Sequence, residues 1–427
     1  MRIEEICKAA RERRFIKRPS SIVNRKLFAV VLMVLPLAAC ARSISREDRE
    51  ANQYFAEILK REDRRFIGED GFWEKNLLSN PSIEVRQWCA LALGRIASPS
   101  ALPWLYRSLH AVEASVRATS AFAIGEIEDR EITAARLMPV DPQAVSELKA
   151  MLDDSSLSVR MRVTEALGKI GGPAEAQEIV KCLGRFPYHG RPEERAYLGF
   201  CITALMRLND PCAIPVLEKM TECDDQEIRR QSADALKQMR RGNSLPMVPA
   251  AFTSENVQNS GPSTPTITDA LAYAFAADRK NSTIAILDTT QGSIEIELFR
   301  QDAPATAAGF VLQAQGGRLN RLEFTRESPS LLVARMPQGL PAAWALRSEV
   351  NMRPFEKGSV GLILPPKESS VAGVFIALAP QPKMDGIYTC FGRIISGMQA
   401  AERMAPGDRI RQVRIKETIS FQDYGRY

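Results

Sequence analysis

Few side chains in this 427-residue sequence have the types and spacing that metal or acid–base chemistry needs. The chain contains two histidines, His110 and His189, and eight cysteines without a CxxC or HxxxH spacing. Protein zinc sites are usually built from such closely spaced pairs. The sequence therefore argues against a metalloenzyme, and we expect no metal and no other cofactor. Two residues remain as candidates for chemistry, the thiol of Cys40 and the guanidinium of Arg326.

Cys40 follows a segment with the features of a secretory signal. Residues 1–39 hold nine Lys or Arg against three Asp or Glu, and the apolar run 27–37, interrupted only by Pro36, leads into the cysteine. A helix of that length rises about 16 Å, which is well short of a hydrocarbon core of ~30 Å. The order of basic, apolar and small residues therefore predicts a signal peptide rather than a permanent transmembrane helix.

The tetrad Leu37-Ala38-Ala39-Cys40 resembles the bacterial lipobox. The resemblance implies lipid attachment to the Cys40 sulfur and cleavage just before it, so that residues 1–39 are a lipoprotein signal peptide. The alternatives are an unmodified signal peptide and a plain hydrophobic segment. Acyl chains contribute about 0.8 kcal/mol per buried methylene and can hold a protein on a membrane. Ala41, rather than Asp, follows the cysteine. We therefore expect a lipid-anchored protein on the periplasmic side of a bacterial cell envelope, at the outer membrane rather than the inner.

The charge of the remaining chain argues against nucleic-acid binding. Residues 40–427 carry 48 basic and 48 acidic side chains, so the net charge of +6 resides in the leader. A nucleic-acid-binding surface normally shows a basic excess. We expect no nucleic-acid partner.

Five twelve-residue blocks recur in the middle of the chain. They read VRQWCALALGRI from Val85, VRATSAFAIGEI from Val116, VRMRVTEALGKI from Val159, YLGFCITALMRL from Tyr197 and IRRQSADALKQM from Ile228. Apolar residues fall at i, i+4, i+7, i+8 and i+11 in the first block, which predicts one face of an amphipathic helix. Segments 102–109, 145–152 and 214–220 predict a second helix between blocks.

Helix pairs with this repeating core resemble HEAT-like repeats, across residues 70–240. The resemblance implies a solenoid whose surface binds a protein partner; a spacer without a partner is the alternative. Arginine recurs at the second block position, at Arg86, Arg117, Arg160 and Arg229. We expect these arginines to pair with acidic neighbours in adjacent repeats. Residues 40–69 predict a charged helix near the anchor, and residues 241–281, rich in Asn, Ser, Gly, Pro and Thr, predict a linker.

The pattern changes from helical to alternating in the C-terminal domain, residues 282–427. Apolar and polar residues alternate on both sides of a turn at Thr289–Gly292, which predicts a β-hairpin. A helix is predicted over residues 303–312, and several short apolar runs follow, ending in the alternating segment Ile410–Ile415. Many short strands with two helices favour a closed antiparallel barrel.

Four segments of this domain resemble a cyclophilin-type peptidyl-prolyl isomerase, over residues 283–418. They are TTQGSIEIELF with DAPATAAGFV, FTR at Phe324–Arg326, VFIAL at Val374–Leu378 and MDGIYTCFGRIISGM from Met384. The predicted fold class is thus multidomain: an all-α HEAT-like solenoid followed by a cyclophilin-like closed antiparallel β-barrel with two helices.

The resemblance also implies site residues. Rotation about an X-Pro bond meets a barrier of about 18–20 kcal/mol, and in the family an arginine donates a hydrogen bond to the imide nitrogen as its lone pair localises; Arg326 matches it. An arginine keeps its charge and its rigid donor fork, which suits that role. The residues predicted to bind the substrate, around a proline pocket, are Phe324, Leu331, Leu332, Phe375, Met384 and Tyr388.

Several positions depart from the family's pattern. Ala334 stands in place of a pocket glutamine, Ala372-Gly373 in place of Ser-Gln, Ile363-Leu364 in place of Ala-Asn, and Tyr388 in place of a histidine. Thr325 and Lys383 replace a further histidine and a tryptophan. The groups that orient a peptide are therefore reduced, and a displacement of about 1 Å can cost 10²-fold in rate.

The sequence leads to two hypotheses of function. The first is a lipid-anchored isomerase of proline-containing polypeptides, with weak activity, whose solenoid recruits client or partner proteins. The second is a catalytically weak or inactive adaptor that binds proteins through both domains. Loss of catalysis in an Arg326 variant separates them.

Overall fold

The computed structural model describes residues 46–135, 137–184, 191–240, 282–335, 348–363 and 373–418. The predicted signal peptide, Cys40, the predicted linker 241–281, Leu364 and Ala372 lie outside these ranges. The described residues from 49 onward belong to one compact unit. Within the described ranges, no helix combines the length and the apolar character needed to cross a membrane.

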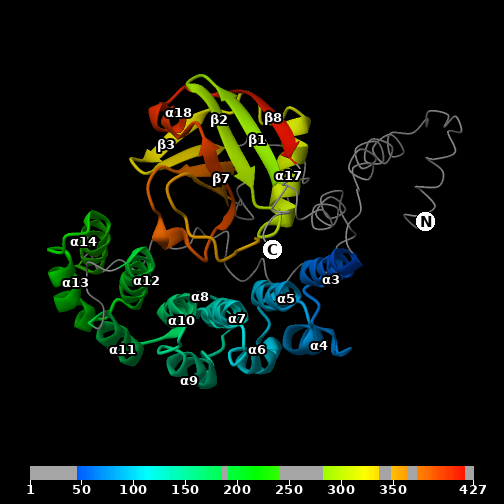
Figure 1. Cartoon of the computed structure of the whole chain (residues 1–427). Coiled ribbons are helices and arrows are strands. Elements are labelled where there is room, and N and C mark those ends of the chain that lie inside the picture. Colours follow the sequence, from blue (N-terminus) through cyan, green and yellow to red (C-terminus); the bar gives the residue numbers. More distant parts are fainter. Residues whose placement is uncertain are drawn as a thin grey trace, which may run out of the picture. The chain divides into compact units, whose positions relative to one another are not determined.

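The first part of the structure is an array of helices (Figure 1). Their bounds are α3 Arg46–Asp63, α4 Phe72–Ser79, α5 Ile83–Ile96, α6 Leu102–Ser108, α7 Ala114–Ile127, α8 Arg130–Ala135, α9 Pro142–Ala150, α10 Leu157–Ile170, α11 Pro173–Leu183, α12 Pro192–Leu208, α13 Ile214–Met220 and α14 Gln226–Arg240, with 3-10 turns at Pro99–Ala101 and Pro211–Ala213. The five predicted blocks lie in α5, α7, α10, α12 and α14, and their apolar faces join one continuous core. The predicted second helices correspond to α6, α9 and α13, and no predicted helix corresponds to α4, α8 or α11.

The block glycines explain how closely the repeats stack. A Cβ atom added to Gly94 would lie 2.9 Å from the Cα atom of Ala123, and one added to Gly125 would lie 2.9 Å from the Cα atom of Ala166. Each alanine occupies the eighth position of the following block. Because any larger side chain would meet backbone there, the glycine sets the distance between successive helices.

The arginines at the second block position pair as predicted in two cases. Arg86 donates to Glu113 at 2.9 Å, and Arg117 donates to both carboxylate oxygens of Asp154 at 2.9 Å. Both acidic residues precede the next block helix, so these bonds link adjacent repeats. The guanidinium of Arg229 instead donates to the carbonyl oxygens of Cys223 and Asp224, at 2.7 Å each, within its own repeat.

The second part is a curled antiparallel sheet with helices α17 and α18 (Figure 1). The elements are β1 Ser282–Thr289, β2 Gly292–Leu298, α17 Pro304–Gln315, β3 Phe324–Ser328, β4 Leu331–Arg335, β5 Ser359–Ile363, β6 Gly373–Ala377, a 3-10 turn at Pro382–Met384, β7 Thr389–Ser396, α18 Met398–Arg403 and β8 Ile410–Thr418. The predicted hairpin is present as β1 and β2, with Thr289 opposite Gly292. The side chains on the inner face form one core with the apolar residues of α17.

The strand order is β3-β4-β6-β5-β7-β2-β1-β8. The end strands β3 and β8 approach each other at one isolated antiparallel bridge, between Glu323 and Arg409. The strands therefore form a curled antiparallel sheet whose two ends meet at one bridge. In the described residues, a continuous ladder that would close it into the predicted barrel is absent.

Candidate active site

Arg326 lies on β3 and is exposed, but its guanidinium is engaged by backbone carbonyls. Nη2 donates to the carbonyl oxygens of Glu402 at 2.7 Å and Met404 at 3.1 Å, and Nη1 donates to that of Pro329 at 3.3 Å. Glu402 and Met404 belong to the C-terminal end of α18, where helix carbonyls have no partner within the helix. A cation is favoured at such an end, which explains why the arginine points there.

Phe375 lies in a small apolar cluster that is separate from the main core of the sheet. Its buried members are Val333, Phe355, Phe375 and Cys390, and its partly buried members are Phe299, Leu331, Ile363, Met384 and Tyr388. The Phe375 ring is 5.1 Å from that of Phe355 and 5.6 Å from that of Tyr388, between centroids. A Cβ atom on Gly361 would lie 2.1 Å from the Phe375 ring, so glycine is required at that position.

The strand register separates the predicted site residues into two groups. Phe375 pairs with Val333, which pairs with Thr325, whereas Arg326 pairs with Leu332, which pairs with Ile376. Paired residues share a face of an antiparallel sheet, and neighbours along a strand point to opposite faces. Arg326 is therefore on the opposite face of the sheet from Phe375.

The structure thus brings together Leu331, Phe375, Met384 and Tyr388 in one cluster. It places Phe324 and Leu332, both predicted to bind substrate, in the main core of the sheet, where they are 1% and 0% exposed. Their roles, like that of Arg326, stay predictions.

Two members of the cluster, Val333 and Phe355, are not among the site residues predicted from the sequence. Strand alternation was the available signal for Val333, because Leu331 and Val333 are two residues apart and share a face of β4. No local pattern marks Phe355, which lies between β4 and β5 and reaches Phe375 through tertiary packing.

A polar contact fixes the turn that carries Met384. The Asp385 carboxylate accepts a hydrogen bond from the backbone N–H of Phe355 at 2.7 Å. Burial, reinforced by the charge of Glu165, raises the pKa of Asp385 to about 7. This hydrogen bond therefore holds the turn that carries Met384 against the backbone of Phe355.

The described residues do not include a group of three or more His, Cys, Asp or Glu side chains that could hold a metal ion. The chemistry available to the cluster is apolar binding, flanked by the Tyr388 hydroxyl. Burial raises the pKa of that hydroxyl, which favours its neutral form.

Comparison with protein families supports the two-part architecture. Residues 72–139 and 115–191 match HEAT repeats, which confirms the predicted repeats, and residues 284–425 match the family described as "Cyclophilin type peptidyl-prolyl cis-trans isomerase/CLD".

Individual relatives each match about a third of this chain. A peptidyl-prolyl cis-trans isomerase of Synechococcus elongatus is 31% identical over 139 residues, which cover 31% of this chain and 96% of the relative. Peptidyl-prolyl cis-trans isomerase B of Bacillus subtilis is 30% identical over 129 residues, covering 29% and 90%. Peptidyl-prolyl cis-trans isomerase-like 1 of Aspergillus niger is 33% identical over 132 residues, covering 29% and 82%. Through its C-terminal domain, this chain belongs to the cyclophilin-type peptidyl-prolyl cis-trans isomerase family.

Proposed function

We propose that this protein is a lipid-anchored peptidyl-prolyl isomerase of a bacterial cell envelope, whose HEAT repeats engage a protein partner. The observation that carries the isomerase assignment is the Phe375 cluster within a domain of this family. Its partly buried side chains, among them Leu331, Met384 and Tyr388, offer apolar surface to a proline ring. The substrates are proline-containing polypeptides.

Catalysis requires a donor at the imide nitrogen, and Arg326 is the family-matched residue. To act, its guanidinium must leave the carbonyls of Pro329, Glu402 and Met404 and pass the edge of β3 toward the Phe375 face. A free-energy cost of only about 1.4 kcal/mol for breaking these hydrogen bonds would slow the reaction about tenfold. We therefore expect turnover well below that of an isomerase with a free arginine.

Replacing Arg326 by alanine tests this proposal. We expect at least a tenfold loss of kcat/KM for Xaa-Pro peptides, measured with the full chain by exchange NMR, because the transition state loses its donor. The matched control is Arg393→Ala, which removes an exposed arginine paired with Glu297 and leaves the rate unchanged. Arg326→Lys keeps the charge without the planar fork, and we expect an intermediate rate.

A specific observation favours the second candidate function, a binding adaptor without turnover. In this structure the donors of Arg326 are bonded to carbonyls and the Phe375 ring is 1% exposed. No acceleration by the folded wild-type chain would support the adaptor and contradict the isomerase. Unchanged turnover in Arg326→Ala would instead contradict the role of Arg326 as the donor.

The membrane anchor is a separate part of the proposal and rests on the lipobox-like sequence ending at Cys40. We expect Cys40→Ala to abolish incorporation of labelled fatty acid in a bacterial host and to move the protein from the membrane to the soluble fraction. The control is Cys7→Ala, in the segment that cleavage removes. We expect it to change neither the incorporation of fatty acid nor the membrane fraction of the protein. Undiminished labelling of the Cys40 variant would show that the sulfur is not the attachment point.

A further inference from the structure

Charged residues recur at the eleventh position of the block helices, where neighbouring positions are apolar. They are Arg95 in α5, Glu126 in α7, Lys169 in α10 and Arg207 in α12. Positions 4, 7 and 11 of a block lie on one side of a helix because they are spaced by three and four residues. We call this side of α5, α7, α10 and α12 the 4-7-11 face.

Several charges of the 4-7-11 face are buried. The side chains of Arg95, Lys169 and Glu165 are 5%, 3% and 5% exposed. Removing a charge from water is costly unless it is paired and hydrogen-bonded. Long charged side chains on the outside of a helical array would normally reach water. Their burial indicates that this face is covered by another part of the protein.

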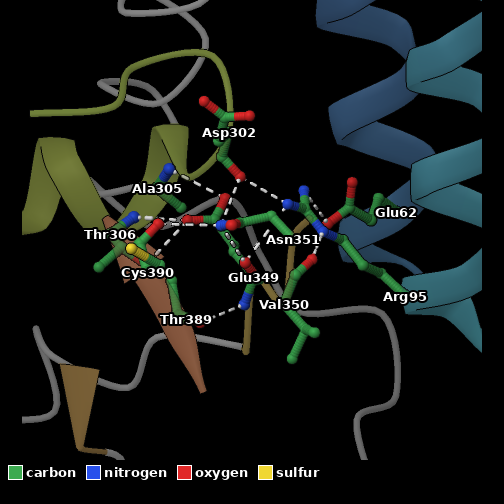
Figure 2. A network of polar contacts seen from close by, with 10 residues as sticks. All are labelled: Glu62, Arg95, Asp302, Ala305, Thr306, Glu349, Val350, Asn351, Thr389 and Cys390. Carbon is green, nitrogen blue, oxygen red and sulfur yellow. Dashed lines mark hydrogen bonds and ion pairs between the residues drawn. The ribbon is translucent and has the colours of Figure 1, made fainter. Parts of the chain in front are cut away.

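The contacts of Arg95 show which part of the protein covers the 4-7-11 face (Figure 2). Its guanidinium donates to the carbonyl oxygens of Asp302 at 2.5 Å, Val350 at 2.8 Å and Glu349 at 3.3 Å, all in the C-terminal domain. Glu62 lies 3.5 Å away and balances its charge from within the helical array. The arginine therefore joins a helix of the repeats to two segments of the cyclophilin-type domain, at Asp302 and at Glu349–Val350.

Two further arginines of the same face make equivalent bonds. Arg162, at position 4 of its block, donates to the carbonyl oxygen of Met352, and Arg207 donates to that of Asp385 at 2.9 Å. All the acceptors are backbone carbonyls. Recognition therefore depends on the backbone conformation of three segments, at Asp302, 349–352 and 385–386, rather than on their side chains.

Gly386 fits closely against Lys169. Its φ of +66° is unfavourable for other residues, and a Cβ atom there would lie 2.4 Å from the Lys169 Nζ atom. The turn at Asp385–Gly386 thus contacts the buried charges of α10. Two separate requirements, the turn conformation and this contact, exclude a side chain.

A groove beside these bonds connects the face to the Phe375 cluster. It has a volume of about 380 Å³, and Phe200, Thr203 and Ile228 of the repeats line it together with Pro354 and Phe355 of the C-terminal domain. The Phe355 ring packs on that of Phe375. A displacement of side chains at the 4-7-11 face can therefore shift Phe375 in the candidate site through its contact with Phe355.

We propose that the 4-7-11 face of the HEAT repeats is a docking surface for the chain's own cyclophilin-type domain, held by Arg95, Arg162 and Arg207 through backbone carbonyls. Docking fixes the loop that carries Met384 and Tyr388, and it occupies a surface that would otherwise be open to partner proteins. This inference goes beyond the proposed function and does not depend on catalysis.

The test uses the full chain with a specific protease site inserted in residues 241–281. After cleavage, we expect the two wild-type fragments to elute together in size-exclusion chromatography. The triple variant Arg95→Ala, Arg162→Ala, Arg207→Ala should release them, with affinity weakened at least 100-fold. The matched control, Arg107→Ala, Arg230→Ala, Arg240→Ala, removes three exposed arginines paired within the repeats and should keep the fragments together.

Two results would overturn the proposal: separation of the wild-type fragments on cleavage, or co-elution of the triple-variant fragments. Should the triple variant fail to fold, Arg207→Ala alone is measured. We expect its two fragments to separate at least tenfold faster than the wild-type fragments. An unchanged rate of separation would overturn the proposal. Association of fragments is read without any isomerase assay. An inactive enzyme and an absent docking contact are therefore distinguishable.

Discussion

Replacing Glu349 by alanine is expected to lower the free energy of unfolding of the C-terminal domain by about 3–5 kcal/mol. The Glu349 side chain is fully buried, and its carboxylate accepts hydrogen bonds from the backbone N–H of Ala305 at 3.0 Å and of Thr306 at 2.7 Å, and from the Thr306 hydroxyl at 2.8 Å. Figure 2 shows these bonds beside the Arg95 contact. A hydrogen bond to a charged group contributes about 1.5–3 kcal/mol, and an abandoned buried donor adds its desolvation cost.

The position of these donors explains why the effect should be large. Ala305 and Thr306 are in the first turn of α17, whose N-cap residue, Ala303, has no side-chain oxygen. The first N–H groups of a helix have no partner within it and favour a negative charge. Glu349, from a distant loop, takes the place of a local cap.

Glu349→Gln is the matched variant, because it keeps an acceptor oxygen without the charge. We expect it to lower the free energy of unfolding by about 1–2 kcal/mol. Glu356→Ala removes an exposed carboxylate of the same domain and is the control. The measurement is chemical denaturation combined with hydrogen exchange of residues 304–315, which reports α17 directly. A loss below about 0.5 kcal/mol in Glu349→Ala would contradict the capping role.

The second large effect is expected from Lys169→Met. The Lys169 ammonium bonds to Glu126 and lies 3.3 Å from Glu165, and these side chains are 3%, 13% and 5% exposed. Removing one partner of a buried ion pair typically costs about 3–5 kcal/mol, because an unpaired charge remains. We expect a loss of that size in the free energy of unfolding of the repeats.

The loss should depend on pH, because the two carboxylates respond differently. Burial raises the pKa of Glu126 to about 7, while the neighbouring Lys169 and Arg162 outweigh burial at Glu165 and lower its pKa to about 2. The folded state therefore binds a proton at Glu126 that the unfolded state, with its ordinary value of 4.5, has released. The corresponding stability is present at low pH and falls as the pH rises through about 7.

Without the lysine, the pKa of Glu126 should rise further, so Lys169→Met should be less destabilising at pH 5 than at pH 8. Adding Glu126→Gln should restore more than half of the loss at pH 8. Lys181→Met, at an exposed lysine paired with Glu178, is the control and should change little. Thermal unfolding across that pH range provides the measurement. An equal loss at both pH values would contradict the assignment of the buried charge to Glu126.

The sequence by itself determined the elements with local periodicity. The spacing of apolar residues predicted the block helices. Alternation predicted the β1–β2 hairpin. These features depend on residues close together in the chain, so their signal is present in a one-dimensional pattern.

Only the tertiary structure decided which side chains meet. The match to the family's pattern predicted Leu332 as a substrate-binding residue. The register of β4 and β6 instead pairs Val333 with Phe375, because a shift of one residue along a strand moves the side chain to the opposite face of the sheet. Arg326 bonds to carbonyls at the end of α18, and Arg95 bonds to a loop more than 200 residues away. Long-range pairing and burial follow from how separate elements pack together, and charged residues such as Arg95 carry no local sign of the carbonyls that they will bind.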